Sequence, residues 1–281
     1  MSYRPQLSNS AVPLTTEVDA MDERGRASRI AIPAERPLTI YLDKRELITL
    51  MTLGGAPEAL TLGYLRNQRL VRAIEDIAAI QVDWDVDAVA VTTRSGVQDI
   101  EQRTASRVVT SGCGQGSMFG GLMDEVDDIV LPTDARLKQS TLYGIVDTIR
   151  TNQSIYKQAG SVHGCALFSA AGEMLYFIED VGRHNAVDAI AGKMWLDEID
   201  GADKLFYTTG RLTSEMVIKG AQMGIPFLLS RSGTTQMGHM VAQQVGMSLL
   251  ARCTGKHFLL LAGQERIEFE SGAADPASPA P

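Results

Sequence analysis

The chain has 281 residues, of which 44% are hydrophobic and 21% charged, proportions typical of a globular protein with one large or two modest domains. No apolar run approaches the roughly 18 residues that a membrane span needs, and a formal net charge of -8 at pH 7 argues against non-specific nucleic-acid binding. The first residues lack the apolar core of a signal peptide, so the sequence predicts a cytoplasmic protein.

Both ends of the chain are predicted to be loose. Residues 1–30 mix Ser, Pro, Asp and Arg without periodicity, and residues 271–281 contain mainly Ser, Gly, Ala, Asp and Pro. Segments of this kind bury too little apolar surface to offset the entropy lost on ordering. Between them, the Leu131-Pro132-Thr133 segment is the predicted boundary of a smaller α+β part, residues 31–132, and an α/β domain, residues 133–270.

The first part is predicted to combine several strands with one helix. The helix starts at Pro57, where the missing N–H of proline is harmless, and Leu60 and Tyr64 would share its inward face. A tight turn at Ser95-Gly96 predicts that the chain doubles back as a hairpin. The predicted elements are the helix at 57–70 and strands at 38–42, 88–93, 97–104 and 107–110.

Strands and helices alternate through the second part, which favours a three-layer α/β domain with a largely parallel sheet. Thr133 is the predicted cap of its first helix and Asn185 that of the next. The buried face of the first helix would comprise Leu137, Leu142, Ile145, Val146 and Ile149. The further predicted elements are strands at 165–169, 174–178, 204–209, 226–230, 247–252 and 258–261, and helices at 185–199, 213–223 and 234–245.

The three cysteines, Cys113, Cys165 and Cys253, lie far apart and form no Cys-x-x-Cys pair. An odd number of thiols in a reducing compartment argues against a disulfide framework. The spacing argues equally against an ordinary structural zinc site. The sequence therefore predicts free thiols and no bound metal.

A cysteine between glycines, in Gly112-Cys113-Gly114-Gln115-Gly116, is the most distinctive local feature. Glycines allow a thiol to be exposed and mobile, and successive backbone N–H groups stabilise the thiolate, which is the reactive form. This pattern is compatible with a nucleophilic or sulfur-carrying cysteine. From the residues alone, however, a small buried residue in a turn is the favoured interpretation, because free cysteines are usually buried and inert.

Three predicted strand-to-helix junctions carry arginines together with hydroxyl groups or glycines. They are Glu179 to Asn185, Thr209-Gly210-Arg211, and Arg231 to Thr235. α/β domains bind ligands at such junctions, and Arg183 and His184 stand where an anion would meet a helix start. Helix capping and a solvated ion pair explain the same residues, so both interpretations stay open.

His163-Gly164-Cys165 places two potential zinc ligands at a strand start. A zinc deaminase would have glutamate at the third position and a Pro-Cys-x-x-Cys segment downstream, and this chain has neither. A structural histidine is the favoured interpretation. A zinc-dependent deaminase or hydrolase is not expected.

Several of these segments together match a known pattern. Glu179 to Asp188 reads EDVGRHNAVD, Leu205 to Pro226 contains Thr-Gly-Arg and Glu-Met-Val, and Pro57 to Val71 has a Pro-x-x-Leu-x-x-Gly-Tyr-Leu spacing. From about residue 38 to 268 the chain resembles the FdhD family, the sulfur carrier proteins needed to make formate dehydrogenase active. The resemblance implies a smaller α+β part joined to a cytidine-deaminase-like α/β part without its zinc, in a cytoplasmic homodimer.

The resemblance also implies a function. Family members accept sulfur as a persulfide from a cysteine desulfurase and pass it to the molybdenum (or tungsten) bis-guanine-dinucleotide cofactor before that cofactor enters formate dehydrogenase. This chain would therefore act as a sulfurtransferase. The persulfide role maps onto Cys113, the first cysteine of the family's Cys-Gly-x-Cys loop, whereas Gly116 replaces the second. A relay or resolving step by a second loop thiol is thus absent.

Candidate cofactor-binding residues come from two sources. The family's Phe-x-Val-Tyr segment corresponds in position to Phe258-Leu259-Leu260-Leu261-Ala262-Gly263, although only Phe258 fits its pattern well. The strand-to-helix junctions add Arg183, Arg211 and Arg231, which would hold the cofactor's phosphates by charge-assisted hydrogen bonds. The alternative function, which the missing second cysteine favours, is a non-catalytic protein that shields the same cofactor and hands it to the dehydrogenase.

Overall fold

The computed structural model describes residues 3–97, 100, 107–108, 118–119, 126 and 128–270. The Cys113 loop and the predicted tail at 271–281 lie outside these residues. Two short strands on either side of the loop, β8 (Arg107–Val108) and β9 (Met118–Phe119), pair with each other in antiparallel fashion. Of the predicted return strand at 97–104, neither Val97 nor Ile100 is in a strand.

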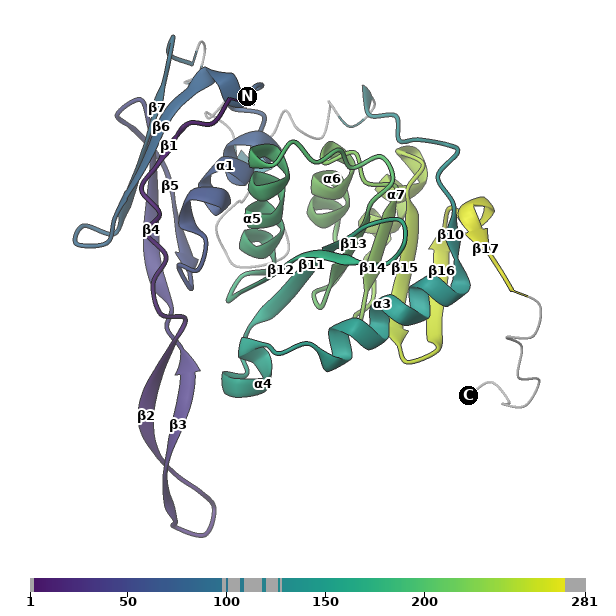
Figure 1. The fold of residues 1–281 in the computed structure, drawn as a ribbon, viewed down its shortest axis with the longest axis horizontal. Helices are drawn as coiled ribbons and strands as arrows, with labels where there is room; N and C mark the ends of the chain where they lie inside the picture. Colours follow the sequence, from purple (N-terminus) through teal and green to yellow (C-terminus); the bar gives the residue numbers. More distant parts are fainter. Residues whose placement is uncertain are drawn as a thin grey trace.

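A five-stranded mixed sheet forms the N-terminal part (Figure 1). Its strands are β1 (Gln6–Leu7), β4 (Arg36–Leu42), β5 (Arg45–Thr52), β6 (Ile77–Asp83) and β7 (Ala88–Thr93). Their order in the sheet is β1-β6-β7-β4-β5. The predicted helix is confirmed as α1 (Pro57–Asn67), and a 3-10 turn spans Ile74–Asp76. Leu60, Leu62 and Leu65 of α1 pack with the apolar face of the sheet.

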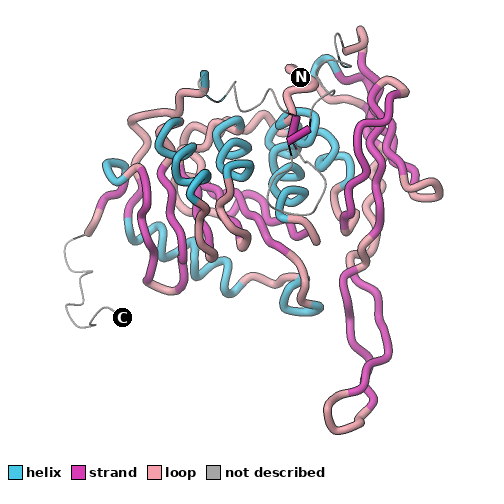
Figure 2. Tube along the Cα trace, turned by 180° about the vertical axis from the view of Figure 1, so that it is seen from behind, coloured by secondary structure: helices cyan, strands magenta, loops and turns pink. Residues whose placement is uncertain are grey.

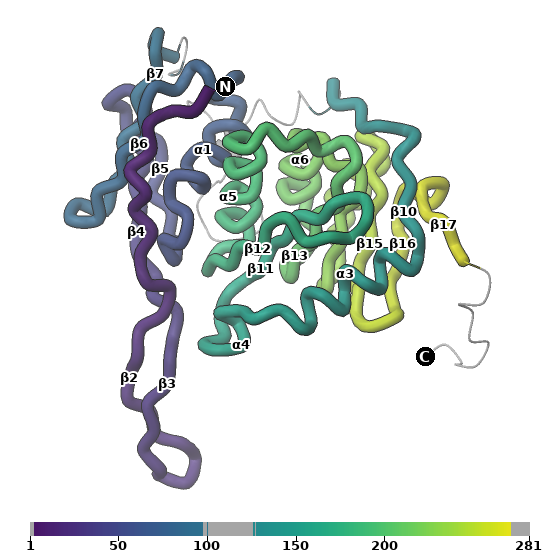
Figure 3. Tube along the Cα trace, viewed as in Figure 1, coloured from purple at the N-terminus to yellow at the C-terminus, as the bar shows by residue number. Residues whose placement is uncertain are grey.

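The prediction of a loose segment over residues 1–30 is wrong. β2 (Thr15–Met21) and β3 (Ala27–Pro33) form an antiparallel hairpin that projects from the body of the molecule (Figures 1 and 3). Nearer the N-terminus, the Tyr3 hydroxyl donates to the Ile77 carbonyl at 2.5 Å and the Ser8 hydroxyl to the Glu58 carboxylate at 2.7 Å. These long-range hydrogen bonds order the segment, and they leave no periodic signature in the sequence.

A six-stranded sheet forms the centre of the second part, in the order β12-β11-β13-β14-β15-β16. Its strands are β11 (His163–Phe168), β12 (Met174–Asp180), β13 (Leu205–Thr208), β14 (Phe227–Ser230), β15 (Ser248–Thr254) and β16 (His257–Ala262). The helices are α3 (Gln139–Thr151), α4 (Ile155–Ala159), α5 (Arg183–Leu196), α6 (Ser214–Gln222) and α7 (Gln236–Gln244), with a 3-10 turn at Gln264–Arg266. The short strands β10 (Leu137–Lys138) and β17 (Ile267–Glu268) pair in parallel beside it.

Helices cover both faces of this sheet, so the predicted three layers are present (Figure 2). On one face, α5, α6 and α7 pack against inward side chains such as Leu167, Phe206 and Leu228. On the other face, Leu142 and Ile145 of α3 pack against the opposite side of the same strands. None of the helices in the described residues is long and apolar enough to cross a membrane.

The sheet is mixed rather than largely parallel, which corrects the sequence prediction. Only the pairs β13–β14 and β14–β15 are parallel, and in each a helix separates the two strands along the chain. At the two edges, tight turns at Gly172 and Gly255 make β11–β12 and β15–β16 antiparallel hairpins. The pair β11–β13 is also antiparallel. Connections this short, residues 169–173 and 255–256, cannot make the crossover that parallel strands require.

Two predicted helix caps are also wrong. The residue before α3 is Lys138, and Leu137 lies in β10, because the chain between Thr133 and α3 pairs with the C-terminal strand β17. α5 begins at Arg183 after Gly182, so Asn185 lies inside the helix. Its side-chain amide donates instead to the Met51 carbonyl at 2.6 Å. Tertiary partners have replaced local capping at both sites.

The two parts meet through a very close contact between α1 and α5, which lie side by side in Figure 1. A Cβ atom built on Gly63 would lie 1.7 Å from the Asp188 carbonyl oxygen, and one on Gly192 would lie 1.9 Å from the Ala59 carbonyl oxygen. The helix backbones therefore touch where neither residue has a side chain. This contact fixes the N-terminal sheet relative to the α/β part.

Candidate functional site

The ends of β13 and β14 and the loops that follow them form one hydrogen-bonded unit. The Ser230 hydroxyl donates to the Gly210 carbonyl at 2.6 Å, and the Thr208 hydroxyl accepts from the Gly210 N–H at 3.1 Å. The Arg231 N–H donates to the Thr208 carbonyl at 3.2 Å. We call this unit, together with the start of β11 and the start of α5, the strand-end site.

The start of β11 and the start of α5 complete the strand-end site. Thr209 exchanges hydrogen bonds with Gly164, whose N–H donates to the Thr209 hydroxyl at 3.0 Å. A Cβ atom on Gly210 would lie 2.6 Å from Cδ of Arg183, so the Arg183 side chain packs directly on that glycine. Burial, and then the charges of Arg183 and Arg211, lower the pKa of His163. The structure thus brings together the three junctions that the sequence singled out.

The three candidate arginines of the strand-end site differ in exposure. Arg183 is buried, 8% exposed, at the start of α5, whereas Arg211 and Arg231 are exposed. The two exposed guanidinium groups suit the binding of an anion at the protein surface. The guanidinium group of Arg183, packed against Gly210, would orient that anion from the protein side. This arrangement makes the strand-end site a candidate phosphate-binding surface.

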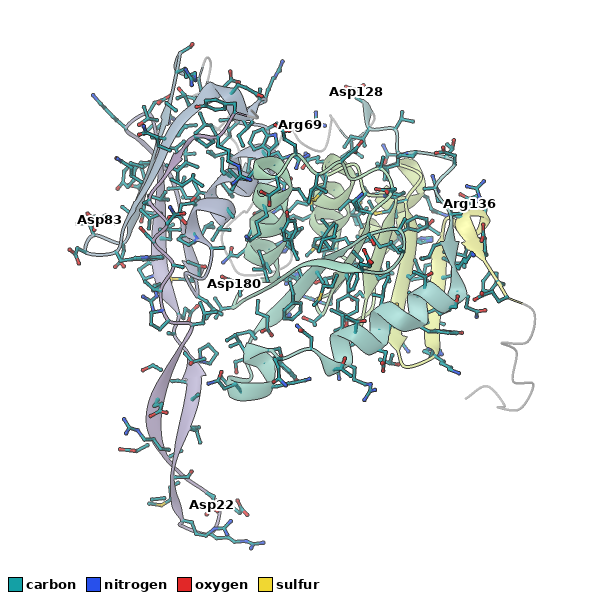
Figure 4. The ribbon with its side chains drawn as sticks, viewed as in Figure 1. Asp22, Arg69, Asp83, Asp128, Arg136 and Asp180 are labelled. Carbon is teal, nitrogen blue, oxygen red and sulfur yellow. The ribbon has the colours of Figure 1, made fainter. Side chains whose placement is uncertain are left out.

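The remaining side chains of the Glu179–Asn185 segment have structural partners. The Asp180 carboxylate, labelled in Figure 4, accepts from the Thr52 hydroxyl at 2.5 Å and from the Leu53 N–H at 3.1 Å. It also accepts from the Asn185 amide at 2.8 Å. Glu179 accepts from two N–H groups at the start of α4. These carboxylates therefore tie β5 and α4 to the site rather than facing a ligand.

A buried ionic cluster, which the sequence analysis missed, lies directly beneath the site. Nζ of Lys219 lies 2.8 Å from Oδ2 of Asp188 and 3.3 Å from Oε1 of Glu215, and all three side chains are at most 3% exposed. Asn67 of α1 donates to Asp188 at 2.7 Å. His184 stands 3.3 Å from Glu215, and burial lowers its pKa to about 3. His184 is therefore neutral at pH 7 and offers no positive charge to an anion.

The sequence contained one usable signal for this cluster. Asp188 and Lys219 each occur among apolar helix residues, and charged residues are almost never fully buried unless they are paired. Nothing in the sequence, however, shows that α5 and α6 bring those two positions together. Only the packed helices reveal the pair.

Cys165 and Cys253 are buried free thiols. Sγ of Cys165 donates to the Thr208 hydroxyl at 3.3 Å, just below the strand-end site. Burial raises the pKa of Cys165 to about 12 and that of Cys253 to about 11. Because the thiolate is the nucleophile, neither cysteine suits sulfur transfer.

We expect iodoacetamide at pH 8 to leave Cys165 and Cys253 of the folded protein unmodified while it alkylates Cys113. A raised pKa lowers the thiolate fraction, so the reactivity of the two buried thiols should increase about tenfold per pH unit above pH 8. Peptide mass mapping measures each site, and protein unfolded in urea, with all three thiols modified, is the control. Rapid alkylation of Cys165 in the folded protein would contradict the burial argument.

The segment Phe258 to Gly263 extends along the edge strand β16 and away from the strand-end site. β16 runs antiparallel to β15, with Ala262 opposite Leu249, near the start of β15. Its first residues therefore lie toward the end of the sheet that carries Arg231, and Gly263 lies toward the opposite end. The structure does not gather this segment and the three arginines around one point.

Potential metal ligands do not converge in the described part of the chain, where no group of three His, Cys, Asp or Glu side chains could hold an ion. His163 and Cys165 have other neighbours, the hydroxyl groups of Thr209 and Thr208. The two residues that suggested zinc in the sequence thus have hydrogen-bonding or packing roles.

Comparison with known proteins identifies the family. The model of the FdhD/NarQ family matches residues 33–268. The chain belongs to the FdhD/NarQ family. It is 30% identical over 242 residues to the sulfur carrier protein FdhD of Saccharolobus solfataricus, covering 84% of this chain and 90% of that protein. It is 27% identical to the FdhD of Wolinella succinogenes, covering 86% of this chain and 84% of that protein.

The fold of this FdhD/NarQ family member agrees with a solved structure. A protein from Desulfotalea psychrophila, assigned as a formate dehydrogenase accessory protein, superposes with a TM-score of 0.75 at 26% identity. The alignment covers 91% of this chain and all of the other. The resemblance to FdhD and the mixed α/β fold class are thereby confirmed. The likeness of the α/β part to cytidine deaminases stays a prediction.

Proposed function

We propose that this FdhD/NarQ family member is a sulfur carrier whose persulfide forms on Cys113. The observation that carries the proposal is the family match over residues 33–268, together with relatives named as sulfur carrier proteins. The buried state of Cys165 and Cys253 supports the assignment to Cys113, the remaining cysteine of the chain. The donor in this proposal is a cysteine desulfurase.

The proposed loading step is a thiol–persulfide exchange. The Cys113 thiolate attacks the outer sulfur of the donor's persulfide, the donor's S–S bond breaks, and the donor cysteine leaves as a thiolate. A new S–S bond forms on Cys113, so the step needs no external oxidant or reductant. The outer sulfur then passes to the molybdenum (or tungsten) bis-guanine-dinucleotide cofactor, the substrate of the second step, before that cofactor enters formate dehydrogenase.

The strand-end site supports a role in holding that substrate. The exposed guanidinium groups of Arg211 and Arg231 can each donate two hydrogen bonds to a phosphate, and the buried Arg183 packs against Gly210, next to Arg211. The glycine at position 210 lets Arg183 approach the loop closely. A homodimer, which the family resemblance implies, would present two such sites to the two dinucleotide halves.

Intact-mass measurement tests the proposal. The protein is incubated with cysteine and a cysteine desulfurase that is shown to be active in the same assay. We expect wild-type protein to gain one sulfur atom that a thiol reductant removes. The matched variant Cys253→Ser should gain the same atom, whereas Cys113→Ser should gain none.

The alternative function, a protein that shields the cofactor without carrying sulfur, predicts a different result. In that case neither wild type nor Cys113→Ser gains sulfur, and both support maturation of formate dehydrogenase equally. That pair of results would overturn the proposed sulfur transfer through Cys113. The missing second loop cysteine, replaced by Gly116, is the observation that makes this comparison necessary.

A further inference from the structure

A cavity of about 590 Å³ lies where α1 and α6 end, away from the strand-end site. α6 begins next to Arg211 and ends at Gln222, and at 1.5 Å per residue its nine residues place the two sites about 13 Å apart. Three arginines, Arg66, Arg69 and Arg72, line the cavity together with Asp128 and Gln222. Arg69 and Asp128 are labelled along the upper edge of Figure 4.

The lining of the cavity is strongly basic for so acidic a chain. Asp128 is the one acidic side chain among the described lining residues, against three guanidinium groups. The chain as a whole has a net charge of -8. A concentration of positive charge in a concave, partly apolar site raises the local concentration of anions. The described lining, and the exposed Arg72 in particular, therefore favours negatively charged ligands.

Arg66, near the end of α1, is half-buried. Its guanidinium group stacks over the ring of Trp195 at 5.7 Å, and Nη1 donates to the Ala191 carbonyl at 3.3 Å. Within the described residues, Arg66 has no carboxylate at ion-pair distance. Burial lowers its pKa, and the more distant charge of Asp200 opposes that lowering. An anion in the adjacent cavity would be a closer counter-charge for this half-buried guanidinium group.

Gln222 provides a second, independent indication of a ligand. Both polar atoms of its side-chain amide are buried, and neither has a hydrogen-bond partner in the described part of the protein. Leaving a buried donor and acceptor unsatisfied is costly, and such groups commonly mark a position that a ligand or ordered water fills. Gln222 also lines the cavity, so a rotation of its side chain would bring the unsatisfied amide to a molecule bound there.

We propose that this cavity binds a small molecule that carries phosphate groups. Arginine forks match phosphate oxygens with two parallel hydrogen bonds, and the Gln222 amide can donate to an oxygen and accept from a ligand hydroxyl. The cavity volume lies within the range of small-molecule sites. The negative ends of the α1 and α6 dipoles oppose an anion, but that effect fades within one turn and is screened by salt.

Titration calorimetry with pyrophosphate, AMP and ribose 5-phosphate tests the proposal and separates the possible sources of the phosphate. We expect at least one of the three probes to bind wild-type protein. Arg72→Gln should weaken that binding about tenfold through loss of a charge-assisted contact, and Gln222→Met should weaken it severalfold. Arg72 is exposed, so its replacement does not endanger the fold.

The matched control is Arg150→Gln, which removes an exposed arginine of α3 on the other face of the sheet. Its affinity for the probe should stay within twofold of wild type. The proposal is overturned when no probe binds wild type, or when Arg150→Gln weakens binding as much as Arg72→Gln does. A melting temperature for each variant separates lost binding from lost folding. Sulfur loading on Cys113 should be unchanged in Arg72→Gln, because the proposed loading step uses no side chain of the cavity.

Discussion

Replacing Gly192 by alanine is expected to destabilise the protein by about 3 kcal/mol or more, despite the higher helix propensity of alanine. The new Cβ would lie 1.9 Å from the Ala59 carbonyl oxygen and 2.7 Å from its carbonyl carbon. These are backbone atoms of α1, so no side-chain rotation can relieve the clash, and the two helices must separate. Urea denaturation measures the loss, and the melting temperature should fall by roughly 5 °C or more for a chain of this size.

The control is an alanine at another glycine inside a helix. A Cβ on Gly144 of α3 would have no heavy atom within 4 Å, so Gly144→Ala should leave stability unchanged or raise it by up to about 1 kcal/mol. The two variants differ only in the space around the added methyl group. Equal stability of Gly192→Ala and wild type would show that the close α1–α5 contact does not exist in solution.

The two glycines also illustrate what the sequence could not reveal. Gly63 and Gly192 interrupt sequences that otherwise favour helix, and a glycine inside a helix indicates only that some close approach is possible. The partner backbone lies more than a hundred residues away along the chain. The position of α1 between the N-terminal sheet and α5 follows from that approach, and only the folded chain shows it.

The local pattern of apolar and polar residues predicted most helices and strands of the α/β part. In that part, the pattern itself determines which segments form buried strands and which form helices with one buried face. Apolar runs such as Leu205–Thr208 and Phe227–Ser230 are fully buried strands, and the intervening helices bury one face against them. Strand direction was mispredicted at the edges, since it depends on whether a turn or a helix joins two strands. The N-terminal hairpin was missed because its order depends on cross-strand pairing and distant hydrogen bonds, not on a buried apolar face.

The candidate site was predictable in position but not in detail. Strand ends followed by helix starts are adjacent in any such sheet, so the proximity of Thr209-Gly210-Arg211 and Arg231 follows from topology. Which side chains face solvent depends on packing. Arg183 lies against Gly210, and His184 turns toward Glu215, where it is neutral. The positive charge that the site offers to an anion is therefore smaller than the sequence suggests, because His184 contributes none.

Lys219→Met is expected to cost about 3–5 kcal/mol of unfolding free energy at pH 7, the range for removing one partner of a buried ion pair. Methionine retains most of the side-chain length but removes the ammonium group that lies 2.8 Å from Asp188 and 3.3 Å from Glu215. The two carboxylates would remain buried without a cation. Urea denaturation at pH 7 measures the loss, and the exposed Lys256→Met in the β15–β16 turn, expected within about 0.5 kcal/mol of wild type, is the control.

The pH dependence of the Lys219→Met variant separates lost charge from lost packing. Burial already raises the pKa of Asp188 above its ordinary value, and Lys219 opposes that rise. Without Lys219, the folded-state pKa of Asp188 rises further above its unfolded value, so the folded variant binds the extra proton as the pH falls. Protonation then stabilises the fold, and the stability gap to wild type should narrow between pH 7 and pH 5. A gap that stays constant over this range would mean that Lys219 acts through packing alone and that the buried cluster contributes no electrostatic stabilisation beneath the site.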